Sequence, residues 1–292
     1  MNRRSILILA CVKITNFGFN AVPLAIFNAA NDYYGPYKDA NCIDSAPLHP
    51  VSIKNCALGD RNQGEVNVLV IGDSHAFSDA GFMNILLSNA HLKGYLIAQE
   101  GTPFILGNIR DWRENHPMQR NSVLNKIIHE KHYPYVVLGG FWNYYSDQKL
   151  LNDNKANTQS YAILEKGLDN ALASIVQAGS TPVLILDTPP LLRVQRFCGK
   201  TPLFKLFTCY NDSQEIERVQ ATTRSILLSM RSKYPSVIFI DPSPVICKHD
   251  RCVASLQGLP IYSTGELNSH MNYPGSTVVG QHYLQQFKNP FV

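Results

Sequence analysis

A serine stands between a strand pattern and a helical pattern in the sequence Gly72-Asp73-Ser74-His75. The preceding residues 66–71 are almost all apolar and mostly β-branched, which is typical of a buried strand. The carboxyl end of such a strand is where α/β sheets bind ligands, and the N–H groups of the next helix point there. This favours nucleophilic chemistry by the serine hydroxyl. A plain strand-to-helix turn, with glycine for backbone freedom and a polar helix cap, uses the same residue types.

A nucleophilic serine needs a base and donors for the oxyanion, and the sequence offers both in other expected loops. His270 lies just ahead of a final helix whose first turn contains Pro274. Gly101 follows the second expected strand and Asn143 follows the third, so a glycine N–H and a side-chain amide would face the same sheet edge. Together with Ser74, these residues predict acyl transfer through a serine ester.

Apolar runs alternate with helical patterns along the chain, which is typical of a parallel sheet with helices on both faces. Asp212, with Glu215 three residues later, predicts the start of one helix. We predict an α/β fold, a three-layer α/β/α sandwich on a five-stranded, mainly parallel, flavodoxin-like sheet. The expected strands are 66–71, 95–98, 135–138, 182–186 and 237–240, and the expected helices are 80–92, 161–176 and 216–230.

Composition narrows the classes of function. The 292 residues have a net charge of +4, only 16% of them are charged, and no run of Lys or Arg occurs. Nucleic acid is therefore not an expected partner. The length fits one large α/β domain. No paired CxxC spacing of a zinc site is present, and we expect neither a metal nor a cofactor.

Six of the seven cysteines form three sequence-local pairs, which favours disulfides in an oxidising, extracytoplasmic compartment. For the last pair, a short disulfide is favoured over a metal-binding loop. The connectivity stays open, because six cysteines can pair in many ways. The pairs are Cys42 with Cys56, Cys198 with Cys209, and Cys247 with Cys252.

Residues 1–30 are typical of a targeting or anchoring segment, because Arg3 and Arg4 precede an apolar stretch without acidic residues. Polar residues and a proline interrupt this stretch, so a signal peptide, a signal anchor and the remnant of a membrane domain all stay open. Residues 31–64, rich in Pro, Asn, Asp and Cys, are expected to form a disulfide-tied lead-in. Residues 65–292 are expected to form the catalytic domain.

The ordered set of motifs resembles the SGNH hydrolase and acyltransferase superfamily. The resemblance is closest to the extracytoplasmic SGNH domains that accompany membrane acyltransferases of bacterial surface polysaccharides, and it covers about residues 42–287. The segments that carry it are Cys56-Ala57-Leu58-Gly59-Asp60, residues 68–76, the stretch with Trp142 and Tyr145, Asp241-Pro242 followed by Cys247 and Cys252, and His270-Met271-Asn272 with Gly275-Ser276.

The resemblance implies a role for each matched residue. Ser74 would be the nucleophile, and His270 would be the general base. The backbone N–H of Ser74, together with Gly101 and Asn143, would form the oxyanion hole. The residues on either side of the serine would order the turn rather than react.

One departure concerns the residue that orients the histidine. The family usually places an aspartate three residues before its histidine, and this chain has Leu267 there. In a serine protease, loss of that carboxylate costs about 10⁴ in turnover. Three alternatives stay open: Glu266 or Asn268 reaches the imidazole, a backbone carbonyl orients it, or the site is impaired.

The hypothesis is an extracytoplasmic serine O-acyltransferase, with acetyl as the expected acyl group, acting on a bacterial surface polysaccharide. It would use an acylated donor and a carbohydrate acceptor, and a separate membrane acyltransferase would supply the acyl groups. Its expected place is the periplasm or the cell surface, with residues 1–30 as a candidate inner-membrane anchor. The aromatic residues after the third expected strand belong either to the core or to a sugar-facing surface; they are Phe141, Trp142, Tyr144 and Tyr145. The alternatives are a stand-alone carbohydrate or lipid esterase and a catalytically weakened glycan-binding module.

Overall fold

A central sheet of six strands organises the chain, in the order β1-β3-β2-β4-β5-β7. The structure is a computed structural model that describes residues 28–29, 31–37, 42, 56–107, 109, 116–146, 160–192, 210–263 and 269–292. All neighbouring strands are parallel except β1, which runs antiparallel to β3. The strands are β1 Ala57–Gly59, β2 Val68–Gly72, β3 Lys93–Ala98, β4 Tyr135–Gly139, β5 Thr181–Ile185 and β7 Ile238–Ile240.

The predicted α/β fold with a mainly parallel sheet is confirmed, and its strand count needs a correction. The five expected strands are β2, β3, β4, β5 and β7, and they have the flavodoxin-like order. The additional strand β1 comes from the lead-in, where it pairs with β3 at the edge of the sheet. A disulfide between Cys42 and Cys56, directly ahead of β1, ties this part of the lead-in together.

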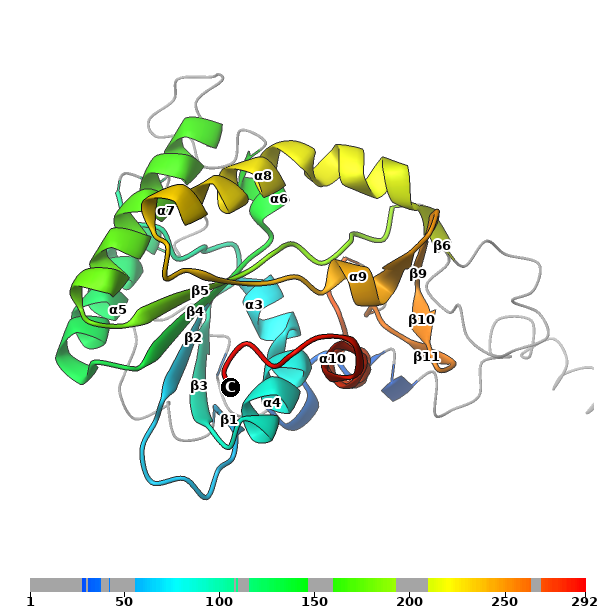
Figure 1. Cartoon of the computed structure of the whole chain (residues 1–292), viewed down its shortest axis with the longest axis horizontal. Coiled ribbons are helices and arrows are strands. Elements are labelled where there is room, and N and C mark those ends of the chain that lie inside the picture. The colour runs from blue at the N-terminus through cyan, green and yellow to red at the C-terminus, as the bar shows by residue number, and fades with distance from the viewer. Residues whose placement is uncertain are drawn as a thin grey trace, which may run out of the picture.

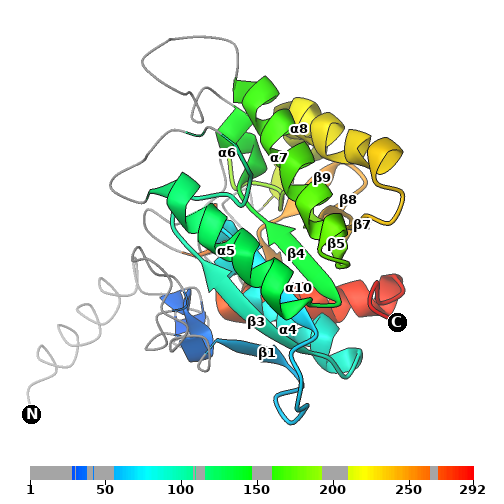
Figure 2. The same cartoon turned by 90° about the vertical axis from the view of Figure 1, so that its left-hand side faces the viewer.

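Helices cover both faces of the sheet (Figures 1 and 2). On one face lie α4 Ala80–Asn89 and α10 Tyr273–Gln286, and on the other lie α5 Pro117–Lys131, α7 Ser160–Gln177 and α8 Ser213–Lys233. Three of these, α4, α7 and α8, correspond to the predicted helices, and α10 is the expected final helix. The shorter helices are α3 Ser74–Ser78, α6 Trp142–Ser146, α9 Ser243–Ile246 and η1 Gly35–Tyr37.

The two faces of the sheet enclose separate apolar clusters, because successive strand residues point to opposite sides. In β2, Val68 and Val70 pack with side chains of α4 and α10. Their neighbours Leu69 and Ile71 pack with side chains of α5, α7 and α8. All four are fully buried. This continuous apolar run makes β2 the rigid centre of the sheet, and the strand ends directly at the serine motif.

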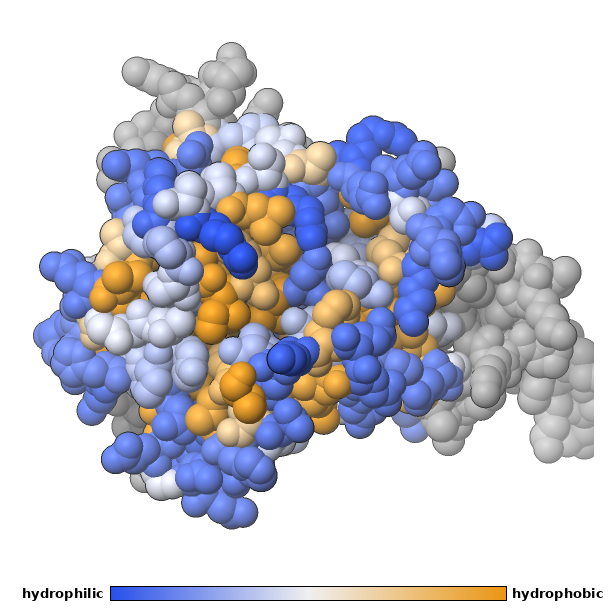
Figure 3. Space-filling view, viewed as in Figure 1, coloured by the Kyte–Doolittle hydropathy of each residue, from blue (hydrophilic) through white to orange (hydrophobic). Residues whose placement is uncertain are grey.

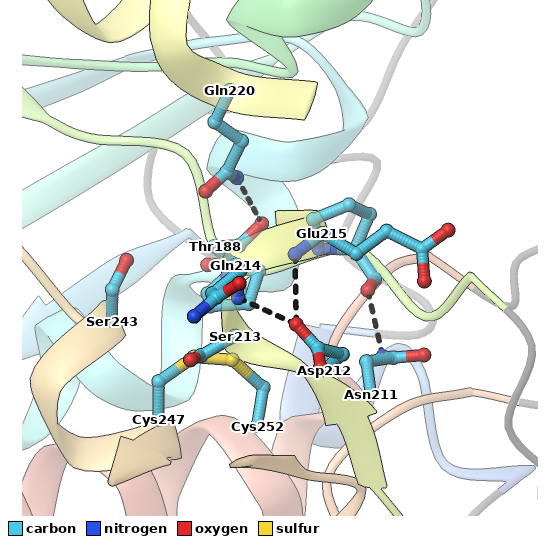
Figure 4. The surroundings of a disulfide bond; sticks show 12 residues. Thr188, Asn211, Asp212, Ser213, Gln214, Glu215, Gln220, Ser243, Cys247 and Cys252 are labelled. Carbon is cyan, nitrogen blue, oxygen red and sulfur yellow. Dashed lines mark hydrogen bonds between the residues drawn. A yellow bond between two sulfur atoms is a disulfide. The ribbon is translucent and has the colours of Figure 1, made fainter. Parts of the chain in front are cut away.

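A small sheet lies beside the main one and precedes the loop that contains His270. Its strands are β6 Tyr210–Asp212, β8 Cys247–Lys248 and β9 Arg251–Val253, in the order β6-β9-β8. The Cys247–Cys252 disulfide joins β8 to β9, and Asp212 caps α8 by accepting hydrogen bonds from the N–H groups of Gln214 and Glu215 (Figure 4). A two-stranded ribbon follows, made of β10 Ser255–Leu256 and β11 Leu259–Pro260.

Two of the three predicted cysteine pairs are thus confirmed as disulfides, and Cys198 and Cys209 lie outside the described residues. The targeting prediction for residues 1–30 also falls mostly outside them. Among the described ranges, no helix combines the length and hydrophobicity needed to cross a bilayer.

The strand β7 forms one edge of the main sheet. Figure 3 shows hydrophobic surface in this region, between α8 and α10, with hydrophilic residues around it. Phe239 of β7 is half-buried, and the Arg231 guanidinium of α8 lies 4.8 Å from the centre of its ring. A charged side chain over an edge strand discourages pairing with another chain.

Candidate active site

Two glycines at the ends of adjacent strands allow the backbone to pack closely around the serine motif. Gly72 of β2 pairs with Gly139 of β4. A Cβ on Gly72 would lie 1.8 Å from the carbonyl oxygen of Gly139, so no side chain fits there. A Cβ on Gly139 would lie 3.0 Å from Ala76 in α3. The first turn of α3 therefore sits directly on the strand ends, and Ser74 lies at the carboxyl edge of the sheet, where the sequence predicts it.

The Asp73 carboxylate orders the turn that carries the serine. It is fully buried and caps α3, with Oδ1 accepting from the N–H groups of His75 at 2.7 Å and Ala76 at 3.4 Å. Its Oδ2 accepts from the N–H of Phe141 at 2.9 Å and from the hydroxyl of Tyr145. All these donors belong to α3 or to the segment after β4. Asp73 therefore joins the β2 and β4 ends of the site and does not approach a substrate.

Ser74 and His270, 196 positions apart in the sequence, form a hydrogen-bonded pair. The distance between His270 Nε2 and Ser74 Oγ is 2.8 Å. The carbonyl of His270 accepts a hydrogen bond from Ser263 N, which fixes the backbone of the loop. A serine hydroxyl held against an imidazole nitrogen at this distance is the arrangement that general-base activation of a nucleophile requires.

Asn272 anchors the histidine loop to the rest of the domain. Its side chain is fully buried, and its Oδ1 accepts the N–H of Gly275, so it caps α10. Its Nδ2 donates to the carbonyls of Pro260 and Tyr262 at 2.9 and 3.0 Å. The position of His270 is therefore set by the start of α10 on one side and by the strand β11 on the other.

The rings of His75 and Tyr33 contact the His270 imidazole. The ring centre of His75 lies 4.2 Å away, and the Tyr33 ring stands almost perpendicular at 5.7 Å. His75 in turn stacks on Phe141 at 4.2 Å. Burial lowers the pKa of His75 to about 3, so this side chain is neutral at physiological pH. His75 thus packs beside the base without adding a second positive charge.

Gly101 and Asn143 follow the strands on either side of β2. Gly101 lies in the loop after β3 with a φ of +62°, a backbone conformation that favours glycine. Asn143 lies in α6, where its N–H donates to Asp187 Oδ2 at 3.0 Å and its Oδ1 accepts from the Thr223 hydroxyl at 3.3 Å. Both residues are at the sheet edge that holds Ser74. Their role in an oxyanion hole stays a prediction.

Trp142 and Tyr145 lie inside the protein, so the structure places this part of the expected sugar-facing surface in the core. Trp142 is fully buried, and its indole N–H donates to the carbonyl of Ile185 at 2.8 Å. Tyr145 is buried against Asp73. The half-buried side chains are those of Phe141 and Tyr144, whose rings stack at 5.8 Å. Residues three apart share a face in a short helix, so the two pairs lie on different faces.

Arg120 is a supporting residue that the sequence analysis missed. Its guanidinium is buried at the start of α5 and donates to the carbonyls of Gly72, Ile97 and Thr102 at 3.0 to 3.3 Å and to Asn121 Oδ1 at 3.1 Å. Burial lowers its pKa to about 10, which leaves it charged at neutral pH. Arg120 therefore links the ends of β2 and β3 and the start of the Gly101 loop.

Two further carboxyl groups are buried at the same edge of the sheet. Burial raises the pKa of Asp187, after β5, well above its usual range, although the N–H of Asn143 donates to it. Burial and the neighbouring Asp73 raise the pKa of Asp79, at the end of α3, in the same direction. Within the described ranges, no three His, Cys, Asp or Glu side chains are grouped to hold a metal ion.

The residues that the sequence analysis considered for orienting the histidine are Glu266, Leu267 and Asn268. They lie outside the described residues. The assignment of Glu266 to the site therefore stays a prediction.

A Ser–His pair at the carboxyl edge of a mainly parallel sheet defines a serine-dependent acyl-transferring class of enzyme. The chain belongs to the family described as "SGNH domain (fused to AT3 domains)", whose model matches residues 41–285. As a member of this family, the chain is a serine-dependent acyltransferase or esterase. The resemblance inferred from the motifs is thereby confirmed.

One solved structure shares the fold at low sequence identity, and two others match with lower TM-scores. The periplasmic domain of a lipopolysaccharide acetyltransferase from Salmonella ser. Paratyphi A is 15% identical, with a TM-score of 0.61 over 89% of this chain and 98% of that one. A putative SGNH hydrolase from Slackia heliotrinireducens is 14% identical, with a TM-score of 0.44 over 76% of this chain and 98% of that one. TesA is 11% identical, with a TM-score of 0.44 over 77% of this chain and 99% of that one. Comparison with curated proteins found no match.

Proposed function

We propose that the protein is an extracytoplasmic serine O-acyltransferase that moves an acyl group, with acetyl as the first candidate, to a hydroxyl of a bacterial cell-surface polysaccharide. The observation that carries the proposal is the 2.8 Å hydrogen bond between His270 Nε2 and Ser74 Oγ in a chain of the SGNH family. The fold shared with a periplasmic lipopolysaccharide acetyltransferase domain supports the compartment and the substrate class.

In the proposed first half-reaction, Ser74 Oγ attacks the acyl carbon of the donor while His270 Nε2 takes the hydroxyl proton. The tetrahedral oxyanion would be held by the N–H groups of Ser74 and Gly101 and by the side-chain amide of Asn143. The bond to the leaving group then breaks, and that group takes the proton from His270. The product is an acyl ester on Ser74.

In the second half-reaction, the acceptor hydroxyl gives its proton to His270 and attacks the acyl carbon. The ester bond to Ser74 breaks, the serine oxygen takes the proton back, and the acyl group leaves on the sugar. Water in place of the sugar gives hydrolysis, so one site accounts for both transferase and esterase activity. The acceptor alone decides which product forms.

For the acceptor, we propose the rings of Phe141 and Tyr144 rather than those of Trp142 and Tyr145. Phe141 stacks on His75, which contacts His270, so this row of rings leads outward from the base. Sugar rings present apolar faces that pack on aromatic side chains. We further propose that a membrane acyltransferase supplies the donor, which is supported by the AT3 fusion named in the family description.

The test is turnover of p-nitrophenyl acetate by the purified protein, with mass spectrometry to find acetyl on the Ser74 peptide. We expect Ser74→Ala and His270→Ala each to lose the Ser74-dependent rate. Ser229→Ala and His282→Ala are matched controls, because the Ser229 hydroxyl donates to the Ile226 carbonyl within α8 and His282 bonds to Gln257 near the surface. Both controls should keep the wild-type rate.

An acceptor sugar separates the alternatives. Transfer predicts that added acceptor raises p-nitrophenol release and yields an acetylated sugar. A rate that the acceptor leaves unchanged, with acetate as the sole product, would favour the stand-alone esterase. Sugar binding that Ser74→Ala leaves intact, with no acyl-enzyme in the wild type, would favour the glycan-binding module. Glu266→Gln should lower the rate only if Glu266 orients the base.

A further inference from the structure

The lead-in reaches across the catalytic pair before the chain enters the sheet. The carbonyl of Asp32 accepts a hydrogen bond from Tyr273 N at 2.9 Å, three residues after His270. Gly35 passes so close to Tyr273 that a Cβ on it would lie 2.3 Å from that ring. Its positive φ of +53° and its hydrogen bond from N to Asp32 Oδ1 form a tight turn there. The lead-in is therefore packed against the beginning of α10.

Within this segment, Tyr33 contacts both members of the pair. Its hydroxyl donates to the carbonyl oxygen of Ser74 at 2.8 Å, and its ring stands perpendicular to the His270 imidazole at 5.7 Å. The same ring packs on Phe77 of α3 at 5.2 Å. Tyr33 is 4% exposed, so these contacts are shielded from water. Burial, followed by the nearby Asp73, raises its pKa well above its usual range, and the hydroxyl stays a donor.

The first turn of α3 is thus held from two directions. Asp73 accepts from the N–H groups that follow Ser74, and Tyr33 donates to the carbonyl of Ser74 itself. The two contacts fix the peptide planes next to the nucleophile. His270 belongs to a loop that is distant in sequence from Ser74. Tyr33 connects the two, because its hydroxyl contacts the serine backbone while its ring contacts the imidazole.

We propose that Tyr33 is a positioning residue for catalysis: it holds the Ser74 turn and the His270 ring at the separation that proton transfer needs. The inference rests on the proposed function of the pair. Its mechanism is geometric, because a displacement of about 1 Å in a reacting group can cost about 100-fold in rate. The lead-in then supplies a residue of the site, although the rest of the domain provides the nucleophile and the base.

The experiment compares Tyr33→Phe, Tyr33→Ala and Tyr37→Phe in the full chain. Tyr37 is the matched control, because it lies in the same segment, is 1% exposed and donates to a backbone carbonyl, that of Ala57 in β1. Turnover of p-nitrophenyl acetate is measured as kcat and KM. The rate of Ser74 labelling by a fluorophosphonate, which reports on the nucleophile without any acyl acceptor, is measured beside it.

Loss of the hydroxyl in Tyr33→Phe should lower kcat and the labelling rate about fivefold, with KM unchanged, as expected for about 1 kcal/mol of hydrogen bonding. Tyr33→Ala should lower both about 100-fold, and Phe at this position should restore most of that loss. Tyr37→Phe should reduce thermal stability as much as Tyr33→Phe while leaving kcat and labelling at wild-type values.

Equal kcat and labelling rates in Tyr33→Phe, Tyr37→Phe and the wild type would overturn the inference, and so would equal losses in the two variants. Failure of the proposed function has a different signature. In that case the wild type itself would show no Ser74-dependent turnover or labelling, and Ser74→Ala would match it.

Discussion

Two buried aspartates stand at the same edge of the sheet, Asp73 after β2 and Asp187 after β5, and they have very different surroundings. Asp73 accepts three backbone N–H groups and the Tyr145 hydroxyl. Asp187 accepts the N–H of Asn143 on Oδ2, whereas its Oδ1 has no hydrogen-bond partner in the described part of the chain. Burial raises the pKa of Asp187 well above its usual range.

The arginines near these two aspartates also differ in their exposure and in their hydrogen bonding. Arg120, close to Asp73, is 5% exposed and bonds to three main-chain carbonyls. Arg224, close to Asp187, pairs with Asp241 and has a side chain that is 37% exposed. At the strand end that carries the serine, the buried carboxylate and guanidinium therefore each have several hydrogen-bond partners, whereas His75 Nε2 has none in the described part of the chain. The strand end at β5 tolerates an incompletely bonded carboxyl and a solvated cation.

Asp73→Asn should have the largest effect of the changes that probe this contrast. An amide presents N–H donors where the carboxylate accepts from four donors, so one or more of them loses its partner. We expect a loss of about 3 kcal/mol in the free energy of unfolding. Displacement of the Ser74 turn should lower kcat/KM about 100-fold. Urea unfolding and p-nitrophenyl acetate turnover measure the two effects.

Asp212→Asn is the control for that change. Asp212 caps α8 through two N–H groups and has no further donors among the described residues, and asparagine is as good a cap as aspartate. Its loss of stability should therefore stay below about 0.5 kcal/mol. If Asp73→Asn were equally mild, the network around Asp73 would not set the position of the serine.

Arg120→Met, with Arg224→Met beside it, tests the two arginines. Removal of the Arg120 guanidinium takes one donor away from the buried carbonyls of Gly72 and Ile97, and the Gly72 carbonyl keeps the N–H of Gln99. We expect a loss of about 3 kcal/mol in the free energy of unfolding. The Arg224 ion pair is half exposed, so its loss should cost less than about 1 kcal/mol. Similar denaturation midpoints for the two variants would contradict the contrast.

Asp187→Asn should have the smallest effect, visible mainly as a change in pH dependence. The pKa of Asp187 in the folded chain lies above its usual value of 3.8, so the folded state holds the proton more tightly than the unfolded state. Stability contributed by this group is complete below that value and is lost as the pH rises through the folded pKa.

Asparagine at position 187 cannot titrate, so the variant does not lose stability in this way as the pH rises. The free energy of unfolding should therefore fall less between about pH 4 and about pH 8 in Asp187→Asn than in the wild type. Urea unfolding at the two pH values measures it. The Asp187 charge also raises the pKa of Asp79, so its removal should reduce the contribution of Asp79 to this fall as well. Parallel curves for the two proteins would show that Asp187 is already ionised when folded.

The strands and the meeting of Ser74 with His270 could be predicted because their signals are local. The apolar run that ends at Gly72 marks β2, and Pro274 marks the helix behind His270. The strand β1 was missed because three residues in a loop-like lead-in show no period. The helix α5 was missed as well, because its apolar face is interrupted by charged and polar residues.

The supporting residues could not be found in the same way. Arg120 shares the spacing of Leu124 and Ile128, both buried, and an arginine on an apolar stripe is the signal that could have revealed it. Trp142 and Tyr145 were considered for the surface because an aromatic cluster alone does not show which face of a one-turn helix points inward. Tyr33 lies in a segment with the composition of a linker, and only the folded chain brings it to Ser74.

The contact between Gly72 and Gly139 has a consequence for how this domain can evolve. The serine and the histidine are needed for the proposed reaction, so a descendant that abandons catalysis is free to replace them. Both glycines are needed for close packing, because a methyl group on Gly72 would overlap the backbone of β4 and one on Gly139 would press against Ala76 of α3. An inactive relative should therefore retain both glycines after Ser74 and His270 have changed. In a survey of related genomes, the two glycines would therefore identify members of the family, and Ser74 with His270 would identify the active ones.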